Sequence, residues 1–227
     1  MINTVMHDDQ HGTALVVLAG LINAIKLRGL TKEDAKILIN GAGAAGLAIT
    51  DLLLNYGFKN IIVCDSKGTI YEGRPDLNEA KIKYAKLTNK GLINTQLVEA
   101  IKDQHIFIGV SQGGVLSEDM VRSMTEQPII FALANPIPEI MPEAAKRAGA
   151  FVVATGRSDF PNQLNNVLAF PGIFRGALDN KVSQITDLML TRAAEKLAAL
   201  VSEPNPELIL PNPFDKEISK TVASAIY

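Results

Sequence analysis

The stretch 36-KILINGAGAAGLAIT-50 joins two elements through a turn rich in glycine. Residues 36–40 are mainly apolar, which predicts a buried strand. The residues that follow the glycines are apolar at helical spacing, which predicts a helix. A buried strand that passes directly into a helix through glycines is typical of parallel α/β sheets.

Strands and helices alternate along the rest of the chain. Apolar runs of strand length follow at 59–65, 104–110, 128–133 and 151–155. Helical patterns lie near 77–87, 97–103, 117–124, 142–150 and 185–201, with a short one from about residue 215. This order predicts an α/β fold, a Rossmann-like doubly wound and mostly parallel sheet with helices on both faces. We expect residues 1–227 to form one domain, with a junction segment and buried helix in 1–30, a Rossmann core in 36–180 and C-terminal helices in 181–227.

Residues 14–25, ALVVLAGLINAI, form the longest apolar run. The run is short for a membrane span, is interrupted by Gly20 and Asn23, and has no basic segment before it. We therefore predict a buried helix and no membrane partner. We also expect this helix to pack against a missing domain or a second subunit, which predicts a homodimer.

Composition excludes several other classes of protein. Hydrophobic residues make up 47% of the chain, enough for a full core. The net charge is −2 without any basic block, so we expect no nucleic-acid partner. Cys64 is the single cysteine, which excludes an internal disulfide and fits a cytoplasmic location.

The glycines at 41, 43 and 46 have the G-x-G-x-x-G spacing of dinucleotide-binding turns. Gly41 allows the tight turn, Gly43 lets backbone approach a pyrophosphate, and Gly46 lets the helix pack on the strand. The start of the helix, with Ala44 and Ala45, offers free N–H groups to the phosphates. The alternative is a close-packed helix start that holds no ligand. We predict a cofactor site at Gly41, Gly43, Ala44, Ala45 and Gly46.

Asp65 ends the second predicted strand, 24 positions after Gly41. An acid at about this offset accepts hydrogen bonds from the adenosine ribose of NAD. Its charge would repel the 2′-phosphate of NADP, so the sequence favours NAD. Ser66 and Lys67 would bind that phosphate if Asp65 turned aside, which leaves NADP as the alternative.

Small and polar residues follow three later strands, at the edge where ligands bind in doubly wound sheets. Ser111 begins the first of these segments and Asn135 lies in the second, directly before a proline. Asn165 and Asn166 form an adjacent amide pair in the third. Amides bind both carboxylates and carboxamides, so we predict cofactor contacts at Ser111, Asn135 and Asn165. Turn or capping chemistry is the alternative for each asparagine.

The segment 7-HDDQH-11 holds four side chains of types that bind metals. Adjacent aspartates suit an oxygen-preferring ion such as Mg²⁺ or Mn²⁺. His7 and His11 have a spacing that binds zinc on a helix, but the glycine that follows favours a loop. The alternative for Asp8 and Asp9 is an acidic pair that stabilises a helix N-terminus.

Together these segments resemble the malic enzyme family, especially its compact bacterial branch. The resemblance rests on HDDQHGTA, NGAGAAG, VCDSKG, ALANPIPEI, VATGRSDFPNQLNNVLAFPGIFRGALD and LPNPFD, in that order along the chain. Met6 stands where the family commonly has phenylalanine. The resemblance covers essentially the whole chain, and it implies the dinucleotide-binding domain of an enzyme that oxidises and decarboxylates malate to pyruvate.

The resemblance also implies roles for individual residues. Asp9 would be a metal ligand for Mg²⁺ or Mn²⁺ and Asp8 its catalytic partner, with Thr13 nearby. Asn135, Asn165 and Asn166 would contact the substrate. The catalytic tyrosine and lysine would belong to a preceding domain that this sequence lacks. We therefore expect an oxidoreductase, and the alternative is a dinucleotide-binding module with little catalysis on its own.

Overall fold

A six-stranded sheet forms the centre of the computed structural model, which describes residues 6–227. Its strand order is β3-β2-β1-β4-β5-β6, and all neighbours are parallel except β2 and β3. This is the order of doubly wound dinucleotide-binding sheets, so the predicted fold class is confirmed. The strands are β1 (Lys36–Asn40), β2 (Asn60–Asp65), β3 (Gly68–Thr69), β4 (Ile106–Gly109), β5 (Ile129–Ala132) and β6 (Val152–Thr155).

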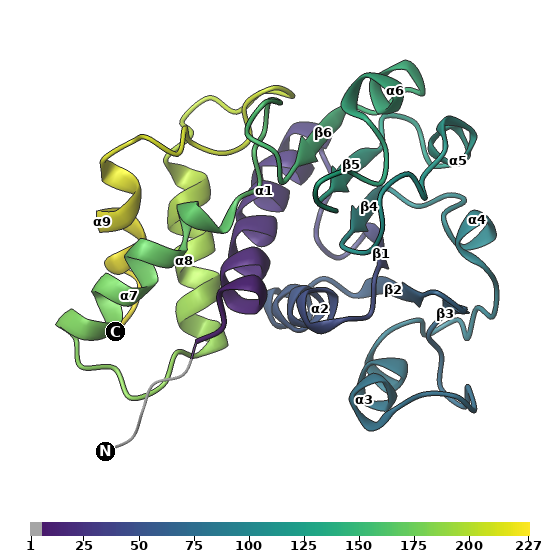
Figure 1. Cartoon of the computed structure of the whole chain (residues 1–227), viewed down its shortest axis with the longest axis horizontal. Coiled ribbons are helices and arrows are strands. Elements are labelled where there is room, and N and C mark those ends of the chain that lie inside the picture. The colour runs from purple at the N-terminus through teal and green to yellow at the C-terminus, as the bar shows by residue number, and fades with distance from the viewer. Residues whose placement is uncertain (1–5) are drawn as a thin grey trace.

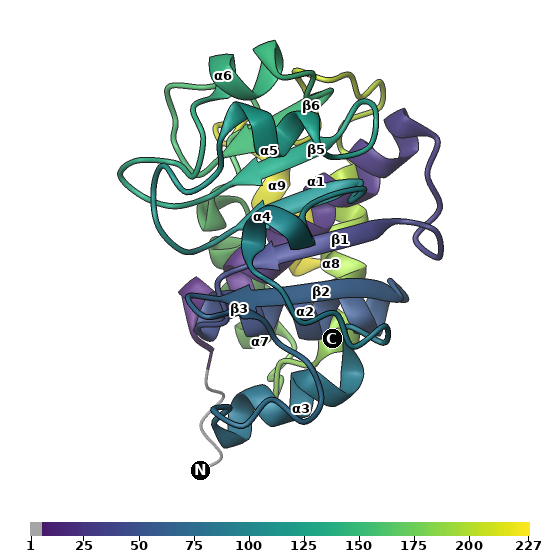
Figure 2. The same cartoon turned by 90° about the vertical axis from the view of Figure 1, so that its right-hand side faces the viewer.

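Helices cover both faces of the sheet (Figures 1 and 2). In Figure 1, α1 lies between the sheet and the group α7, α8 and α9, whereas α4, α5 and α6 lie on the far side of the strands. A π-helical turn η1 (Asp8–Gly12) leads into α1, and a 3-10 turn η2 (Asn166–Leu168) precedes α7. The helices are α1 (Thr13–Arg28), α2 (Ala44–Tyr56), α3 (Glu79–Leu87), α4 (Leu97–Ala100), α5 (Glu118–Arg122), α6 (Pro142–Arg147), α7 (Phe170–Asp179), α8 (Asp187–Ala199) and α9 (Glu217–Ala223).

Alternating side chains of the strands supply two hydrophobic cores. Ile37 and Ile39 point to the core shared with α1, α2 and α8. Leu38, which lies between them, points to the smaller core shared with α5 and α6. Because both faces are covered, the strands are apolar throughout, as is usual in parallel sheets.

Helix α1 lies inside the larger core. The segment Gln10–Arg28 is long and apolar enough to cross a membrane by length and composition, but most of it is buried within the protein. The Asn23 amide donates to the carbonyl oxygens of Ala198 and Ile209, at 2.9 Å each, which ties α1 to the C-terminal segment. The partners of α1 therefore belong to this chain. The expectation that another domain or a second subunit covers this helix is wrong.

Helix α7 is an element that the sequence pattern does not predict. Its glycines and its proline are residues that usually interrupt helices. Pro171 lies in the first turn, where a missing N–H costs little. A Cβ atom at Gly172 would lie 2.5 Å from Cβ of Val222, and one at Gly176 would lie 2.6 Å from the carbonyl oxygen of Ala223. The two glycines are thus required for close packing of α7 against α9.

Candidate functional site

A cleft opens at the carboxyl ends of β1 and β4, the point where the strand order reverses. Its volume is about 400 Å³. Asn40, the last residue of β1, donates its amide N–H to Oγ of Ser111 at 2.8 Å, which links the two strand ends. The cleft is lined by Asn40, Gly41, Ala42, Gly43, Asp65, Ser66, Lys81, Gln96, Leu97, Ser111, Gln112 and Val115.

The glycine turn has the geometry that the motif predicts. Gly41 has a φ of 126°, in the region that favours glycine. A Cβ atom at Gly46 would lie 1.7 Å from the carbonyl oxygen of Gly41, so only glycine fits between the strand and the helix. No atom lies within 4 Å of the place that a Cβ would take at Gly43. This open backbone position is therefore accessible to a phosphate group.

Helix α2 presents its N-terminus to this cleft. Gly43 is the N-cap residue, and no side chain caps the helix. The first N–H groups of a helix, together with its dipole, favour an anion. Ala44 and Ala45 form the first turn of α2, so their backbone faces the same end of the helix.

Asp65 lies at the cleft within a cluster of charged side chains. Nη2 of Arg74 lies 2.9 and 3.2 Å from its two carboxylate oxygens, and Nζ of Lys81 lies 2.6 Å from Oδ2. The backbone N–H of Lys67 donates to Oδ1 at 2.9 Å. Burial alone would raise the pKa of Asp65, but the hydrogen bonds from Lys81, Lys67 and Arg74 outweigh it and lower the pKa. Asp65 is therefore a carboxylate at neutral pH.

The two residues after Asp65 differ in position. Ser66 lines the cleft, whereas the ammonium group of Lys67 pairs with Asp76 at 2.8 Å. The side chain of Lys67 is 68% exposed and is not among the residues that line the cleft. Lys81, a residue that the sequence patterns do not identify, lies there instead. It comes from α3, far enough along the chain that no local motif includes it.

Glu139 is a second residue that the motifs do not identify. Its carboxylate is fully buried and accepts backbone N–H groups of Ser111 and Ala134, both at 3.0 Å. The side chain thus holds the loops after β4 and β5 against each other. Its contact with Ala134 lies directly before Asn135 in the chain. Burial raises the pKa of Glu139, and the two N–H donors oppose that rise. In the sequence, Glu139 is the one charged residue of the apolar run PIPEIMP. A charged residue in such a run is rarely buried without partners, so this pattern could have indicated its structural role.

The three predicted asparagines lie after β5 and β6 and adopt different roles. Asn135 is exposed and precedes a cis peptide bond to Pro136. The side-chain oxygen of Asn165 caps η2 by accepting the N–H of Val167 at 2.9 Å. The capping alternative therefore holds for that oxygen, and the amide nitrogen of Asn165 makes no hydrogen bond to the described residues. None of the three lines the cleft between β1 and β4.

Asp8 and Asn166 come together across the chain. Nδ2 of Asn166 donates to Oδ2 of Asp8, which joins η1 to η2. The ring of His11 faces the backbone of His7, with Nδ1 3.1 Å from the His7 nitrogen. The side chain of Asp9 lies outside the part of the chain that the structure describes. Within the described part, no three His, Cys, Asp or Glu side chains form a group that would hold a metal ion.

Comparison with known proteins identifies the family. A family model described as malic enzyme, NAD binding domain, matches residues 10–227. The chain belongs to the malic enzyme family. The family resemblance inferred from the sequence motifs is thereby confirmed.

The relatives of this malic enzyme chain are longer proteins. It is 56% identical to the bifunctional malic/malolactic enzyme of Bacillus subtilis, with 98% of the chain matching 55% of that protein. It is 48% identical to an NADP-dependent malic enzyme of Rhizobium meliloti, with 98% of the chain matching 31% of that protein. The crystal structure of the NAD-dependent malic enzyme of Thermotoga maritima superposes with a TM-score of 0.96 at 47% identity, over all of this chain and 60% of that one.

These comparisons establish a dinucleotide as the cofactor of this malic enzyme domain. Relatives that use NAD and relatives that use NADP are both similar to the chain. The chain spans about half the length of several of the relatives it matches. Of the predicted cofactor residues, the structure brings together Gly41, Gly43, Asp65, Ser66 and Ser111 around one cleft.

Proposed function

We propose that this chain supplies the dinucleotide-binding part of an enzyme that oxidises and decarboxylates malate to pyruvate and CO₂. The observation that carries the proposal is the cleft between β1 and β4, with a glycine turn on one side and the uncapped start of α2 beside it. A dinucleotide bound there would supply the hydride acceptor for malate oxidation. The first relatives have names that include malic enzyme activity, which supports malate as the substrate.

In this proposal the residues of the glycine turn hold the pyrophosphate of the cofactor. Gly43 leaves the space for it, and the N–H groups of Ala44 and Ala45 lie at the positive end of α2. Ser111, held by the Asn40 amide, lines the same cleft. Amides at Asn135, Asn165 and Asn166 would then donate hydrogen bonds to the substrate carboxylates or the nicotinamide.

Asp8 and Asp9 are proposed to complete a metal site together with residues outside this chain. Carboxylates suit Mg²⁺ or Mn²⁺, which would supply Lewis-acid stabilisation of negative charge on the substrate oxygen. The hydrogen bond from Asn166 fixes the Asp8 carboxylate in η1, the turn that leads into α1. The described residues alone do not assemble three ligands, so other residues would have to complete the site.

We further propose that the chain binds the dinucleotide by itself but turns over malate negligibly. Oxidation requires a base for the hydroxyl proton, and formation of pyruvate requires an acid that protonates the enol carbon. The family resemblance assigns these roles to a tyrosine and a lysine in another domain. Relatives that extend well beyond the matched segment support this division of labour.

NAD is the proposed cofactor, with NADP as a weaker ligand of the same cleft. Asp65 lines the cleft, where its carboxylate would accept a hydrogen bond from the adenosine ribose, and this supports NAD. Arg74 and Lys81 nevertheless neutralise this carboxylate, so its repulsion of a 2′-phosphate is weaker than that of an isolated acid. Lys81 and Ser66 line the cleft and would tolerate that phosphate.

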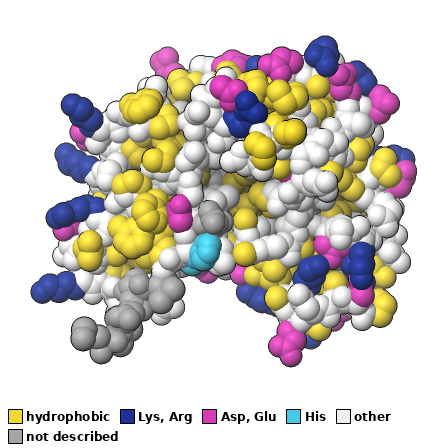
Figure 3. All heavy atoms as spheres, viewed as in Figure 1, with side chains coloured by type: hydrophobic (Ala, Val, Ile, Leu, Met, Phe, Trp, Pro, Cys, Tyr) yellow, Lys and Arg dark blue, Asp and Glu magenta, His cyan; other side chains and the backbone are white. Residues whose placement is uncertain are grey.

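A cytoplasmic homodimer is the proposed state of the protein. Helix α7 exposes Phe170, Phe174 and Leu178 to solvent, at 39%, 39% and 74%. Figure 3 shows hydrophobic side chains gathered over this part of the molecule, at the left of the view. Exposed apolar patches of this kind often mark protein interfaces. Light scattering of the purified chain tests the dimer, and a monomer at all concentrations would exclude it.

A spectrophotometric assay tests the proposed activity. The chain is incubated with malate, Mn²⁺ and either NAD or NADP, and cofactor binding is measured separately by calorimetry. Binding of NAD with negligible NADH formation is the expected result. Rapid NADH formation would refute the division of labour, and absence of binding would refute the cofactor role itself.

A further inference from the structure

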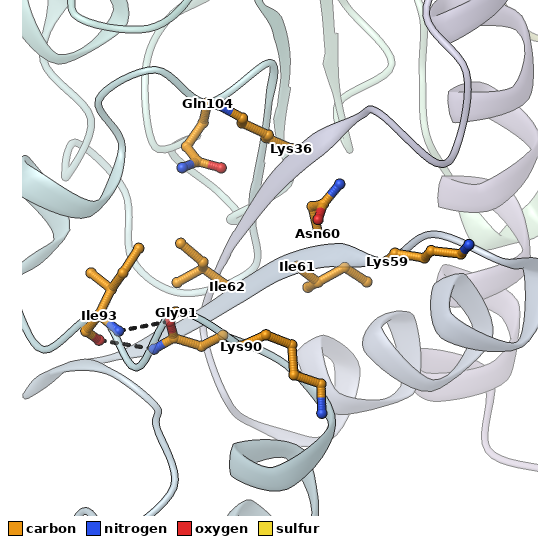
Figure 4. Close-up of a pocket in the computed structure, with 10 residues that line it drawn as sticks. Lys36, Lys59, Asn60, Ile61, Ile62, Lys90, Gly91, Ile93 and Gln104 are labelled. Atoms are coloured by element: carbon orange, nitrogen blue, oxygen red, sulfur yellow. Dashed lines mark hydrogen bonds between the residues drawn. The ribbon is translucent and has the colours of Figure 1, made fainter.

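A second pocket lies at the opposite edge of the sheet from the dinucleotide cleft (Figure 4). It is formed at the amino ends of β1 and β2, where Lys36 pairs in register with Asn60. Four residue steps along β1 separate Lys36 from Asn40, so about 13 Å of strand divides the two sites. The pocket is therefore independent of the proposed malate chemistry.

The wall of this pocket is a rigid loop. Asn89 uses its side chain to donate to the carbonyl oxygens of Ile70 and Ile93, at 3.0 and 2.8 Å, and to accept the N–H of Ile93 at 2.9 Å. Its own backbone N–H donates to the carbonyl oxygen of Ile61 at 2.8 Å. Asn89 is only 4% exposed. The loop from Asn89 to Ile93 is thus fixed against β2, and the pocket is preformed.

The interior of the pocket combines apolar surface with one unused amide. Ile61, Ile62 and Ile93 supply the apolar surface. Gln104 is 7% exposed, yet its side-chain amide makes no hydrogen bond to any of the residues described in the structure. The amide atoms of Gln104 reach the open pocket, so they are available to hydrogen-bond a bound ligand. Figure 4 shows Gln104, Asn60 and Ile62 around the same hollow.

Positive charge surrounds this amide. Lys36, Lys59 and Lys90 line the pocket, and no acidic side chain is among its lining residues. In Figure 4, Lys36 extends toward Gln104, whereas Lys59 and Lys90 extend outward at the rim. The ammonium groups of Lys36 and Lys59 have no hydrogen bond or ion pair within residues 6–227. Lys36 is thus the cation best placed to meet an anion that also contacts Gln104.

We propose that this pocket binds a small carboxylic acid with an apolar body. Its carboxylate accepts hydrogen bonds from the Gln104 amide and the Lys36 ammonium group, and its body packs on Ile62 and Ile93. The volume of about 230 Å³ corresponds to about eight water molecules at liquid density, which limits the ligand to a small acid. Tight binding requires both the carboxylate and the apolar body of the ligand, because the pocket presents both positive charge and apolar surface.

Nuclear magnetic resonance of the ¹⁵N-labelled chain tests the proposal with benzoate as the probe. Benzyl alcohol has the same ring without charge, and inorganic phosphate has charge without the ring. Benzoate is expected to shift the Gln104 side-chain amide and the Gly91 N–H signal with a saturable curve in the millimolar range, as expected for so small a ligand. Benzyl alcohol and phosphate are expected to bind more weakly.

Two surface variants provide the matched control. Lys36→Gln should weaken benzoate about threefold or more, whereas Lys59→Gln, with the same change in net charge, should have a smaller effect. Gln104→Met should weaken benzoate about tenfold through loss of the charged hydrogen bond. If Gln104→Met misfolds, the comparison of Lys36→Gln with Lys59→Gln still tests the proposal, because both lysine side chains are exposed and their replacement should leave the fold intact.

Four outcomes would overturn the proposal. The first is no saturable shift at about 10 mM benzoate. The second is benzyl alcohol or phosphate binding as tightly as benzoate. The third is equal weakening by Lys36→Gln and Lys59→Gln, which would indicate diffuse attraction to charge. The fourth is shifts confined to residues outside this pocket.

Discussion

Replacement of Asp65 by asparagine should change which dinucleotide the protein prefers. The Asp65 carboxylate receives four hydrogen bonds, two from Nη2 of Arg74, one from Lys81 and one from the Lys67 N–H. Asparagine keeps a single acceptor oxygen and places an NH₂ group beside the cations. The variant therefore frees positive charge at the cleft.

The magnitude follows from the charges of the cluster. Asp65 and Asp76 oppose Arg74, Lys67 and Lys81, which gives a net charge of +1, and Asp65→Asn raises it to +2. One unit charge about 5 Å from a phosphate charge is worth about 3 kcal/mol at an effective dielectric constant of about 20. Solvent at the cleft and the partial exposure of Lys81 reduce this to about 1.4 kcal/mol, a factor of about ten.

Fluorescence titration with NADH and NADPH measures the effect. The ratio of the NADPH to the NADH dissociation constant should fall about tenfold in Asp65→Asn. Asp76→Asn is the matched control, because it makes the same change in charge within the cluster but does not line the cleft. Its ratio should change much less. An unchanged ratio in Asp65→Asn, or equal changes in the two variants, would refute the reasoning.

Three further predictions concern the residues that support the cleft. Gly46→Ala should destabilise the fold by about 3 kcal/mol in urea unfolding, because its Cβ would lie 1.7 Å from the Gly41 oxygen. Gly43→Ala, by contrast, should leave the free energy of unfolding unchanged but weaken NADH binding. The pKa of Glu139 in the folded protein is raised above 4.5. Its contribution to stability is therefore complete below pH 4.5 and is lost as pH rises through the folded pKa. Glu139→Gln should thus flatten the dependence of the unfolding free energy on pH above 4.5. Burial raises the pKa of Cys64 to about 12, so iodoacetamide should not label native Cys64 at neutral pH, and rapid labelling seen by mass spectrometry would contradict its buried position.

The fold could be predicted because its signals are local. The apolar strand before Gly41 and the helix after it are neighbours in sequence, and parallel strands buried on both faces read as continuous apolar runs. Helix α7 could not be predicted in this way. The glycines that weaken it as an isolated helix are required by α9, which lies more than forty residues later in the chain. Tertiary packing thus outweighs local propensity there.

The same distinction explains which site residues could be predicted. Gly43, Asp65 and Ser111 belong to motifs with fixed spacing, so the sequence identifies them. Lys81 reaches Asp65 from α3, and Glu139 reaches Ser111 from the loop after β5. These contacts depend on how distant segments pack, which no short motif records. The ammonium group of Lys67 pairs with Asp76 and does not line the cleft, so its contact with a 2′-phosphate stays a prediction.

The central claim is that the cleft between β1 and β4 binds the dinucleotide. A crystal structure of the chain with NADH bound tests this claim most directly. We predict that the pyrophosphate lies beside Gly43 at the N-terminus of α2 and that the adenosine ribose lies next to Asp65. Cofactor density at any other place, or none at saturating NADH in crystals where the cleft is open to solvent, would contradict the account.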